Sequence, residues 1–389
     1  MGIEGMLERE DFYKILQETL KVYFLKVRHK EVTCQYEPFE DGEMLRIYTK
    51  GSIVCRPNKP KGAREFLKAE YNIRNSLLKN IVGKCLVHYL MCTKTAFSPK
   101  CIFLTKGVLG ENEFISPQNR SIRIYDYVQS HVDCIIKQGF TDKYFNNQIA
   151  FRKQYQYDFM VPLIDSGEGW FREPILKGHP LARVTGKGKY QNGIDTAVQY
   201  IQKLANDTLE YKPAQKYVPE LLVKAKQLTE EAKQKKNVAT YNKCLALLEF
   251  VEQGLSRVTM EIPTCMSHGD FQTGNIWMNN DGNVLLYDWE TAGRRSVWYD
   301  STTLLYSLRR VFGWEQFFGD PRPVQSLVCD PNKDRMAEEF ESIKRIVLLE
   351  DYMFLIEDMM ELPMDWGKDV FDGNIQRLYQ VVNAKNSIS

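Results

Sequence analysis

The sequence lacks the features that mark several classes of protein. No C-x-x-C pair occurs, and the cysteine count, nine, is odd. The chain therefore offers no metal site of that type and no fully paired disulfide framework. Its longest apolar runs fall far short of the ~20 residues that span a bilayer. The start, Met1-Gly2-Ile3-Glu4, also lacks the basic and apolar regions of a signal peptide. These absences predict a cytoplasmic protein without a transmembrane segment, whose cysteines are core thiols.

The numbers of positively and negatively charged residues are also nearly equal. Lys and Arg number 52 against 50 Asp and Glu, a net charge of +2, which argues against a dedicated nucleic-acid binder. The 43% apolar content is enough for a sizeable core and excludes global disorder. The charge is uneven, since residues 51–100 hold ten Lys or Arg and only two Asp or Glu. A solvated basic face explains this excess; peripheral contact with an anionic surface or glycan is the alternative.

The pattern of apolar residues divides the chain into three parts. Residues 1–105 alternate helical and strand-like patterns and carry no chemical motif, which predicts an appended α+β extension. Residues 106–176 contain short β-type runs and one helix, and residues 177–389 are mainly helical. A small sheet followed by a large helical part predicts an α+β fold with two lobes.

The segment 267–290 carries the chemistry. Asp281-Gly282 between two apolar runs predicts a two-residue hairpin. Residues equally distant from such a turn face each other, so Asn275 and Asp288 should lie side by side. Hard oxygen ligands of this kind suit Mg²⁺ that phosphates also hold. Asp270 lies in the loop just before, where a carboxylate could address an incoming hydroxyl. The spacing disfavours an ordinary polar hairpin.

These residues also carry a family resemblance. The run His268-Gly269-Asp270, with Asn275 and then Asp288-Trp289-Glu290, resembles the catalytic loop and metal-binding signature of the aminoglycoside phosphotransferase and choline kinase superfamily. The resemblance implies a protein-kinase-like fold that uses ATP and Mg²⁺ to phosphorylate a small-molecule hydroxyl. The roles it implies are catalytic base for Asp270, Mg²⁺ ligands for Asn275 and Asp288, and scaffolding for His268 and Asp300.

If the resemblance holds, an ATP lobe lies upstream. The stretch 161–181 resembles the approach to the hinge between lobes, so adenine is expected beside Glu173 and Ile175. Lys137, at the end of an apolar strand, would reach the nucleotide's phosphates. The polar turn before that strand resembles the phosphate-covering loop, although it is not Gly-rich. Its candidate residues are Ser116, Asn119 and Ser121.

One departure from the family pattern concerns the partner of Lys137. The family has Glu on the following helix, whereas the helix predicted at 143–155 contains no Glu, and Gln148 is the best match. An alternative pair is Arg56 with Glu70. A neutral partner for Lys137 keeps open a non-catalytic, nucleotide-binding scaffold. A protein kinase is disfavoured, because no Asp-Phe-Gly or Ala-Pro-Glu segment occurs.

Acidic residues on the C-terminal helices suggest the acceptor. Residues seven apart share a helix face. The two acidic pairs are Glu350 with Glu357 and Asp351 with Asp358. They would suit a cationic acceptor such as an amino sugar or choline, and a solvated helix face is the alternative. A resemblance to phosphotransferase-like proteins of surface-polysaccharide clusters favours a sugar or glycan-linked hydroxyl.

Overall fold

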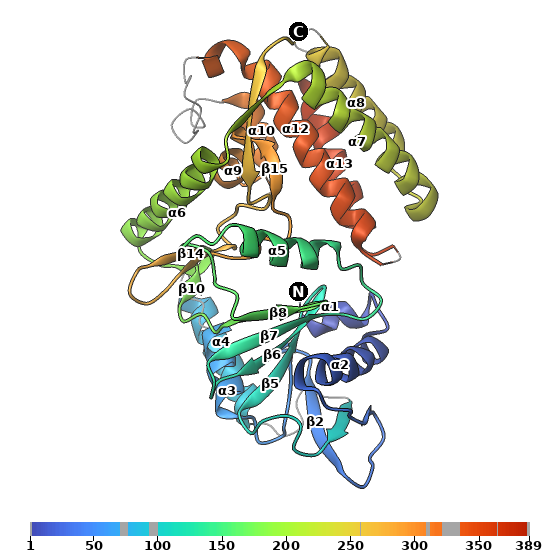
Figure 1. Ribbon diagram of the computed structural model, residues 1–389, viewed down its shortest axis with the longest axis vertical. Coiled ribbons are helices and arrows are strands. Elements are labelled where there is room, and N and C mark those ends of the chain that lie inside the picture. The colour runs from blue at the N-terminus through green and yellow to red at the C-terminus, as the bar shows by residue number, and fades with distance from the viewer. Residues whose placement is uncertain are drawn as a thin grey trace. The chain divides into compact units, whose positions relative to one another are not determined.

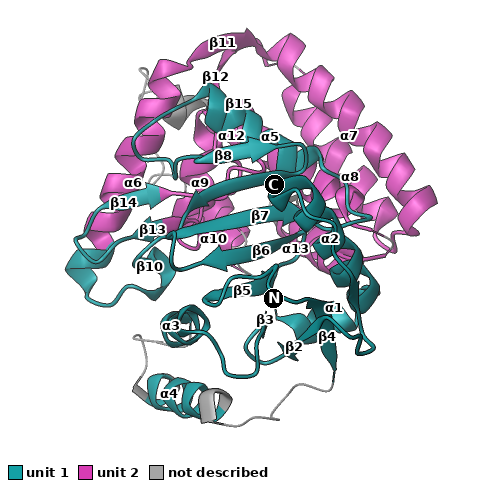
Figure 2. Cartoon of the chain, turned by 60° about the horizontal axis from the view of Figure 1, so that its bottom comes forward, with its two compact units in different colours: residues 1–190, 277–285 teal, residues 191–276, 286–389 magenta. Residues whose placement is uncertain are grey.

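The computed structural model describes residues 2–70, 77–92, 100–256, 258–308, 312–320, 335–363 and 365–386. The chain forms two compact units (Figure 2). Unit 1 comprises residues 1–190 and 277–285, and unit 2 comprises residues 191–276 and 286–389. Unit 1 is rich in strands and unit 2 is mainly helical. This division confirms the predicted α+β class with a β-rich part and a helical part.

Unit 1 is built on one antiparallel sheet in the order β1-β4-β2-β3-β5-β6-β7-β9-β8 (Figure 1). The strands are β1 (Cys34–Gln35), β2 (Gly42–Tyr48), β3 (Ile53–Cys55), β4 (Cys101–Thr105), β5 (Glu113–Pro117), β6 (Ser121–Asp126), β7 (His131–Ile136), β8 (Asp165–Gly167) and β9 (Trp170–Pro174). Val54 of β3 pairs with Ile115 of β5, so strands before and after residue 105 share this sheet. The boundaries at residues 105 and 176 stay predictions.

Helices cover both faces of this sheet. The helices of this unit are α1 (Ile3–Leu7), α2 (Phe12–Arg28), α3 (Lys61–Glu70), α4 (Leu77–Cys92) and α5 (Lys143–Gln154). Buried residues of α1 and α2 pack on one face with Ile122, Ile124 and Ile135. Residues of α3 and α5 pack on the other face. Because side chains alternate along a strand, Arg123 and Tyr125 lie on the face of α3 and α5.

Apolar residues between positions 9 and 27 recur at helical spacing, and α2 occupies this stretch. The Asp11 carboxylate accepts a hydrogen bond from the Lys14 N–H (3.4 Å) at its start, as an N-cap does. The helix ends at His29, whose left-handed backbone (φ 53°) lets its N–H bond the Phe24 carbonyl. Within the basic stretch 51–100, α3 and α4 are helical, and residues 71–76 lie outside the described part.

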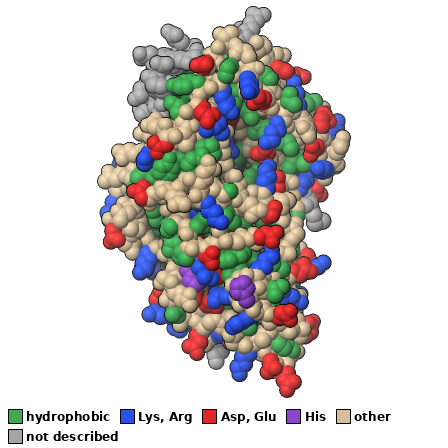
Figure 3. Space-filling view, in the orientation of Figure 1, with side chains coloured by type: hydrophobic (Ala, Val, Ile, Leu, Met, Phe, Trp, Pro, Cys, Tyr) green, Lys and Arg blue, Asp and Glu red, His purple; other side chains and the backbone are tan. Residues whose placement is uncertain are grey.

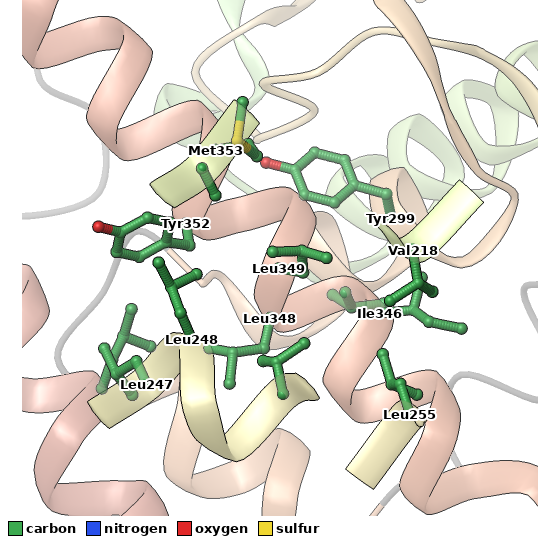
Figure 4. Close-up of a cluster of buried hydrophobic side chains, with 14 of the residues drawn as sticks. Val218, Leu247, Leu248, Leu255, Tyr299, Ile346, Leu348, Leu349, Tyr352 and Met353 are labelled. Atoms are coloured by element: carbon green, nitrogen blue, oxygen red, sulfur yellow. The ribbon is translucent and has the colours of Figure 1, made fainter. Parts of the chain in front are cut away.

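Unit 2 packs its helices around a large apolar cluster. The short helix η1 (Leu181–Arg183) still belongs to unit 1, and α6 (Lys187–Asp207) begins there and continues into unit 2. The other helices of unit 2 are α7 (Ala214–Lys236), α8 (Tyr241–Leu255), α9 (Trp298–Tyr306), α10 (Gly313–Gly319), α12 (Arg335–Glu361) and α13 (Lys368–Asn386). Figure 4 shows Ile346, Leu348 and Leu349 of α12 among side chains of α7, α8 and α9. The mainly helical character predicted for the C-terminal part of the chain is thus present in unit 2.

Two small sheets carry the chemical segment. The first has the order β10-β13-β14 and the second the order β11-β12-β15. Their strands are β10 (His179–Pro180), β11 (Glu210–Pro213), β12 (Glu261–Ser267), β13 (Ile276–Met278), β14 (Val284–Leu286) and β15 (Gly293–Ser296). The residues between β12 and β13 form the predicted catalytic loop.

The remaining compositional predictions concern thiols, charge and the membrane. Cys34, Cys55, Cys134 and Cys244 are buried thiols, and burial raises the pKa of Cys34 and Cys55 to about 12. Charged side chains of both signs are interspersed on the face in Figure 3. Within the described ranges, no helix combines the length and apolarity that crossing a membrane requires.

Candidate active site

Asp300 holds the loop that follows β12. The residue lies in the first turn of α9 and is buried. Its Oδ1 accepts hydrogen bonds from the Ser267 hydroxyl (2.8 Å) and the Gly269 N–H (3.0 Å), and its Oδ2 accepts one from the His268 N–H (2.7 Å). One buried carboxylate thus satisfies three donors of the loop, which fixes its backbone. The scaffolding role of Asp300 stays a prediction, which these contacts make concrete.

Gly269 is required by the shape of this loop. Its φ is +84°, a conformation that residues with a side chain rarely adopt. A Cβ at this position would lie 2.3 Å from the Thr291 carbonyl oxygen and 2.7 Å from the Arg295 Nη1. The loop can therefore pass close to residue 291 only because residue 269 has no side chain.

Asp270 and Asn275 are held together by hydrogen bonds within the loop. The Asn275 side-chain amide donates hydrogen bonds to the Asp270 carbonyl and to its Oδ2, both at 2.9 Å. The Gln272 amide donates a further bond to the same Oδ2 (2.8 Å). Asp270 is half-buried, whereas Asn275 is buried. Two amide donors therefore hold the carboxylate in one orientation while part of it stays accessible to solvent.

The hairpin is present, but its register differs by one residue from the prediction. The Tyr287 N–H bonds the Asn275 carbonyl (3.2 Å), and the Asn279 N–H bonds the Asn283 carbonyl (2.9 Å). Asn275 thus faces Tyr287 instead of Asp288. The turn is longer because the Asn279 Oδ1 accepts the N–H groups of Asp281 (3.0 Å) and Asn283 (2.8 Å). Gly282, with φ +90°, completes this three-residue connection.

Asp288 follows the hairpin in an unusual backbone conformation. Its φ is +68°, which is uncommon for a residue other than glycine. Conformations of this kind cluster at functional sites, where the surrounding structure over-determines them. The side chain is half-buried and follows directly after Tyr287, the residue paired with Asn275. A role in binding a ligand would account for an aspartate in this backbone conformation.

The donor set fits magnesium better than a metal with a dedicated cage. Within the described ranges, no group of three or more His, Cys, Asp or Glu side chains could hold a metal ion. Mg²⁺ requires no such cage, because it binds one or two protein oxygens plus phosphates and water. Both Asn275 amide bonds to Asp270 come from its nitrogen, which leaves its oxygen as the atom suited to a cation.

His268 supports the site from within the protein. Its side chain is buried, and its Nε2 lies 3.0 Å from the Tyr287 carbonyl oxygen. The imidazole packs on Trp289, with ring centroids 4.5 Å apart. These contacts connect the loop after β12 with the end of the hairpin, and the scaffolding role of His268 stays a prediction. Sequence reasoning missed Ser267 and Tyr287, although both flank residues of the motif.

Lys137 has a different partner from the one predicted. Its Nζ lies 2.6 Å from the Glu10 Oε1 and 3.5 Å from the Met6 sulfur. The prediction that Gln148 pairs with Lys137 is therefore wrong. Gln148 is buried on α5, which packs on the opposite face of the sheet, while Lys137 lies against the N-terminal helices. The sequence contains no local signal for Glu10, which lies 127 residues away.

Burial dominates the electrostatics of this pair. It raises the pKa of Glu10 and lowers the pKa of Lys137, and each charged partner only partly opposes the shift. Both side chains are at most 5% exposed. Lys137 as a phosphate ligand stays a prediction, but it would require release from Glu10.

The alternative pair of Arg56 with Glu70 is also wrong. Arg56 binds the Glu43 carboxylate and the carbonyls of Leu109 (2.6 Å) and Gly110 (2.6 Å). Glu70 instead binds Arg183, with a shortest distance of 2.7 Å. Arg56 therefore ties β3 to β2 and to the loop before β5.

The predicted phosphate-covering turn joins β5 and β6. Ser116 is buried, and its hydroxyl donates to the Ser52 carbonyl (3.1 Å) and accepts from the Gln118 amide (2.9 Å). These bonds make Ser116 a structural residue of the turn. Asn119 is exposed and Ser121 is half-buried, so both stay candidates for contact with phosphate.

The predicted adenine contacts lie at the end of β9. Glu173 binds Arg152 of α5 (3.0 Å), and this contact places the Glu173 side chain on the α5 face of the sheet. The Ile175 N–H bonds the Ser130 carbonyl (3.0 Å), and its side chain packs against the cluster beneath α5. Both remain candidates for nucleotide contact through their other atoms.

The acidic pairs of α12 are not alike. Glu350 is buried and accepts hydrogen bonds from the Ser296 N–H (2.6 Å), the Ser296 hydroxyl (2.7 Å) and the Tyr217 hydroxyl. Asp351 is buried and accepts from the Tyr299 hydroxyl (3.0 Å). Neither lies on a solvated face, and their contacts indicate a structural role.

The second residue of each pair is more accessible. Glu357 forms an ion pair with Lys224, and its side chain is 18% exposed. Asp358 is half-buried. These two residues stay predictions for contact with an acceptor.

Comparisons with known proteins bear on the same residues. Residues 195–321 match the model of a phosphotransferase enzyme family. No curated protein matches the chain. The kinase-like fold class expected from the sequence agrees with the family match.

Several solved structures are similar at low identity. An ethanolamine kinase of Plasmodium vivax is 10% identical, with a TM-score of 0.48 over 81% of this chain and 93% of that one. A choline/ethanolamine kinase family protein of Mesorhizobium loti is 13% identical, with a TM-score of 0.44 over 71% and 90%. A mutant aminoglycoside phosphotransferase with AMP-PNP and hygromycin B is 11% identical, with a TM-score of 0.48 over 71% and 96%.

These scores are too low to support an argument about function, so the weight rests on the family match. The matched span, residues 195–321, includes Asp270, Asn275, Asp288 and the anchoring Asp300. Over that span, the family match agrees with the resemblance seen in the sequence: residues 195–321 are similar to a phosphotransferase enzyme family.

Proposed function

We propose that this protein transfers the γ-phosphate of ATP to a hydroxyl group of a small molecule, in a reaction that requires Mg²⁺. The observation that carries the proposal is the loop around Asp270, which Asp300 anchors and the Asn275 amide orients. The family match over residues 195–321 supports the same reaction class. The compositional absences favour the cytoplasm as its location.

Asp270 is the proposed catalytic base. Its carboxylate would accept the proton of the acceptor hydroxyl while the hydroxyl oxygen forms a bond to the γ-phosphorus. The bond between that phosphorus and the β–γ bridging oxygen breaks, and ADP leaves with the electron pair. Phosphoryl transfer depends mainly on positioning. The two amide bonds to the Asp270 Oδ2 supply part of that positioning.

Asn275 and Asp288 would hold the metal ion. When bound, Mg²⁺ supplies positive charge that neutralises the phosphate oxygens. On the protein side, the Asn275 nitrogen binds Asp270, so the metal ligand and the base belong to one network.

The acceptor is proposed to be an amino sugar, a sugar or an amino alcohol, and a place in surface-polysaccharide metabolism would fit such an acceptor. Glu357 and Asp358 of α12 would favour a cationic group, since Glu350 and Asp351 are occupied by internal hydrogen bonds. Trials with neutral and cationic acceptors test this preference directly.

A second candidate is a kinase-like scaffold that binds a nucleotide without turnover. The observation that favours it is the Lys137–Glu10 ion pair, which occupies the lysine predicted to bind phosphates. The intact set of Asp270, Asn275 and Asp288 favours the enzyme instead.

Transfer of label from γ-labelled ATP separates the two candidates. The purified protein is incubated with Mg²⁺ and a panel of amino sugars, choline, ethanolamine, nucleosides and simple sugars, with Asp270→Asn as the matched control. We expect one acceptor class to be labelled. The control should reduce labelling by about 10²- to 10⁴-fold and leave ATP binding intact.

Three outcomes distinguish the possibilities. Labelling that survives Asp270→Asn would contradict the assignment of the base. Binding of Mg-ATP without labelling across the panel would favour the scaffold. Failure to bind Mg-ATP would contradict both candidates.

A further inference from the structure

The two faces of the unit 1 sheet hold different charged groups near the strand predicted to bind phosphates. Asp133 lies in β7, and Lys137 directly follows the strand. Both side chains point toward the N-terminal helices, where Asp133 binds Tyr23 and Lys137 binds Glu10. Glu173, the predicted adenine neighbour, lies on the other face with Arg152. A nucleotide in contact with Glu173 would therefore lie across the sheet from Lys137.

Arg123 occupies the face on which Glu173 lies. It pairs across the strands with Cys134 of β7, whose side chain packs beneath α5 with Phe171. Its strand neighbour Tyr125 packs on the same face against Phe66 of α3 (5.3 Å between ring centroids). Arg123 therefore lies between the part of the face under α3 and the part under α5.

The guanidinium of Arg123 is only partly satisfied. Its Nε atom is buried and has no hydrogen-bond partner, yet the residue as a whole is half-buried and not sealed from solvent. Burial lowers its pKa, but the electrostatic contributions of Cys134, Tyr125 and Glu173, together with a side-chain hydrogen bond to Tyr125, outweigh burial and raise the pKa well above its usual value. Arg123 thus stays cationic and keeps an unused donor.

The nearest carboxylate does not balance this charge. Glu173 is engaged by the Arg152 Nη1 (3.0 Å), so one carboxylate serves two guanidinium groups. Arg152 is otherwise satisfied, since its remaining nitrogens donate to the carbonyls of Val161 and Pro162. The surplus positive charge belongs to Arg123, and an anionic ligand on this face would neutralise it.

We propose that Arg123 of β6, and not Lys137, is the cation in unit 1 that binds the phosphates of the nucleotide. This proposal rests on the proposed function and names the residue for which sequence reasoning chose Lys137. A guanidinium can bind two phosphate oxygens at once, which a lysine ammonium cannot do in the same geometry. Lys137 is then a structural residue that fastens the N-terminal segment.

Nucleotide binding by calorimetry tests the proposal. ATP, ADP and adenosine are titrated in the presence of Mg²⁺ into the wild-type protein, Arg123→Gln and Arg123→Lys. We expect Arg123→Gln to weaken ATP and ADP about ten- to hundredfold, because it removes charge-assisted hydrogen bonds. Adenosine, which has no phosphate, should bind all three proteins equally, and Arg123→Lys should recover part of the ATP affinity.

Arg46→Gln is the matched control. Arg46 also has a buried Nε without a partner and lies on the same face, because its neighbours Leu45 and Ile47 pack on the other one. It belongs to β2, three strands away from β6 in the sheet order. Its substitution should leave ATP affinity unchanged. The pair Glu10→Gln with Lys137→Met tests the rival assignment without leaving a lone buried charge.

The outcomes separate this proposal from the proposed function. If the wild-type protein binds ATP and Arg123→Gln binds it equally well, the role of Arg123 is refuted and the kinase proposal stands. Loss of ATP affinity in the Glu10 and Lys137 double variant alone would return the role to Lys137. Equal loss of adenosine and ATP in Arg123→Gln would show a structural defect and overturn the proposal, and a wild-type protein that binds no nucleotide would overturn both.

Discussion

Two buried charges in this molecule are held in different ways. Asp300 of unit 2 is surrounded by hydrogen-bond donors of residues 267–269, about thirty positions earlier in the chain. Lys137 of unit 1 depends on one carboxylate from residue 10. The first charge is stabilised by two backbone N–H groups and one hydroxyl of a single loop, and the second by a single ion pair that has been removed from water.

The difference between Asp300 and Lys137 indicates which kind of buried charge can be recognised from a sequence motif. A carboxylate that accepts several N–H groups stabilises one backbone conformation, so the residues around it recur as a pattern. In a buried ion pair, the Coulomb attraction between the charges is little larger than the free energy lost when both charges leave water. The Glu10 and Lys137 pKa values shift toward the neutral forms, which is the sign of that cost.

The largest expected effect is on the ion pair. Lys137→Met leaves Glu10 buried without its partner, and we expect a loss of about 3–5 kcal/mol in unfolding free energy at neutral pH. The double variant with Glu10→Gln should return close to the wild-type value. Urea unfolding of all four proteins, including Glu10→Gln alone, measures the coupling.

The pH dependence checks the cause of that loss. Without Lys137, the pKa of Glu10 rises further, and a group with a raised folded-state pKa contributes stability that is lost as pH rises through that value. The defect of Lys137→Met should therefore shrink at acid pH. A defect of equal size at every pH would contradict desolvation of Glu10 as its origin.

Next in size is the anchor of the catalytic loop. Asp300→Ala leaves two backbone N–H groups and one hydroxyl without their acceptor, and we expect a loss of about 3 kcal/mol. Misplacement of Asp270 should also lower the transfer rate by about 10²-fold. Thermal unfolding and the labelled-ATP assay measure the two effects.

Thr302→Val is the control for Asp300. Thr302 is buried in the same helix and donates to the Trp298 carbonyl (2.7 Å), without contact to the loop. Its transfer rate should match the wild type. If Asp300→Ala transfers phosphate as fast as the wild type, the position of the loop does not depend on Asp300. The difference drawn between Asp300 and Lys137 would then be contradicted.

Glu350 tests a third buried carboxylate, intermediate between the other two. Burial raises its pKa although Tyr217 and Ser296 donate to it. Below its unfolded value both states are protonated, so Glu350→Gln should equal the wild type there. As pH rises toward the folded-state pKa, the wild type should lose stability relative to the variant, by at most about 1.4 kcal/mol per pH unit. Unfolding midpoints across pH 4–8 measure this change; a constant difference would contradict it.

The smallest effect concerns the backbone at Asp288. Asp288→Ala and Asp288→Gly both remove the carboxylate, and both should abolish Mg²⁺-dependent transfer. Glycine alone tolerates φ +68° without penalty, so the Gly variant should be more stable than the Ala variant by about 1 kcal/mol. Thermal unfolding of the two variants measures the difference. Equal stability would show that the backbone there relaxes at no cost.

The parts of the site that the sequence predicts are those fixed by neighbouring residues. Asp270 and Asn275 meet because they lie in one loop. The predicted hairpin register was wrong by one residue, because the Asn279 side chain binds two backbone N–H groups and lengthens the turn. Turn type thus depended on a side-chain bond that the Asp281-Gly282 pair does not reveal.

Other errors arose from contacts between distant elements. No periodicity indicates that Glu10 reaches Lys137. The seven-residue spacing on α12 correctly places Glu350 and Glu357 on one face, but it does not tell which part of a helix is surrounded by other elements. The two-part α+β fold was predictable because strand-like and helical patterns occupy separate stretches of the chain. The strands shared across residue 105 depend on the pairing of β3 with β5, for which the sequence has no local signal.

The ion pair between Glu10 and Lys137 can form only after the ribosome has synthesised both residues. A ribosome that adds about 5–20 residues per second places Lys137 after Glu10 by roughly 6 to 25 seconds. During that interval the apolar side chains of Leu16, Leu20 and Phe24 have no β6 or β7 to cover them. Until β6 and β7 are synthesised, α2 of the nascent chain therefore lacks the strands that bury its apolar face, and this exposed face makes the unfinished chain prone to aggregation.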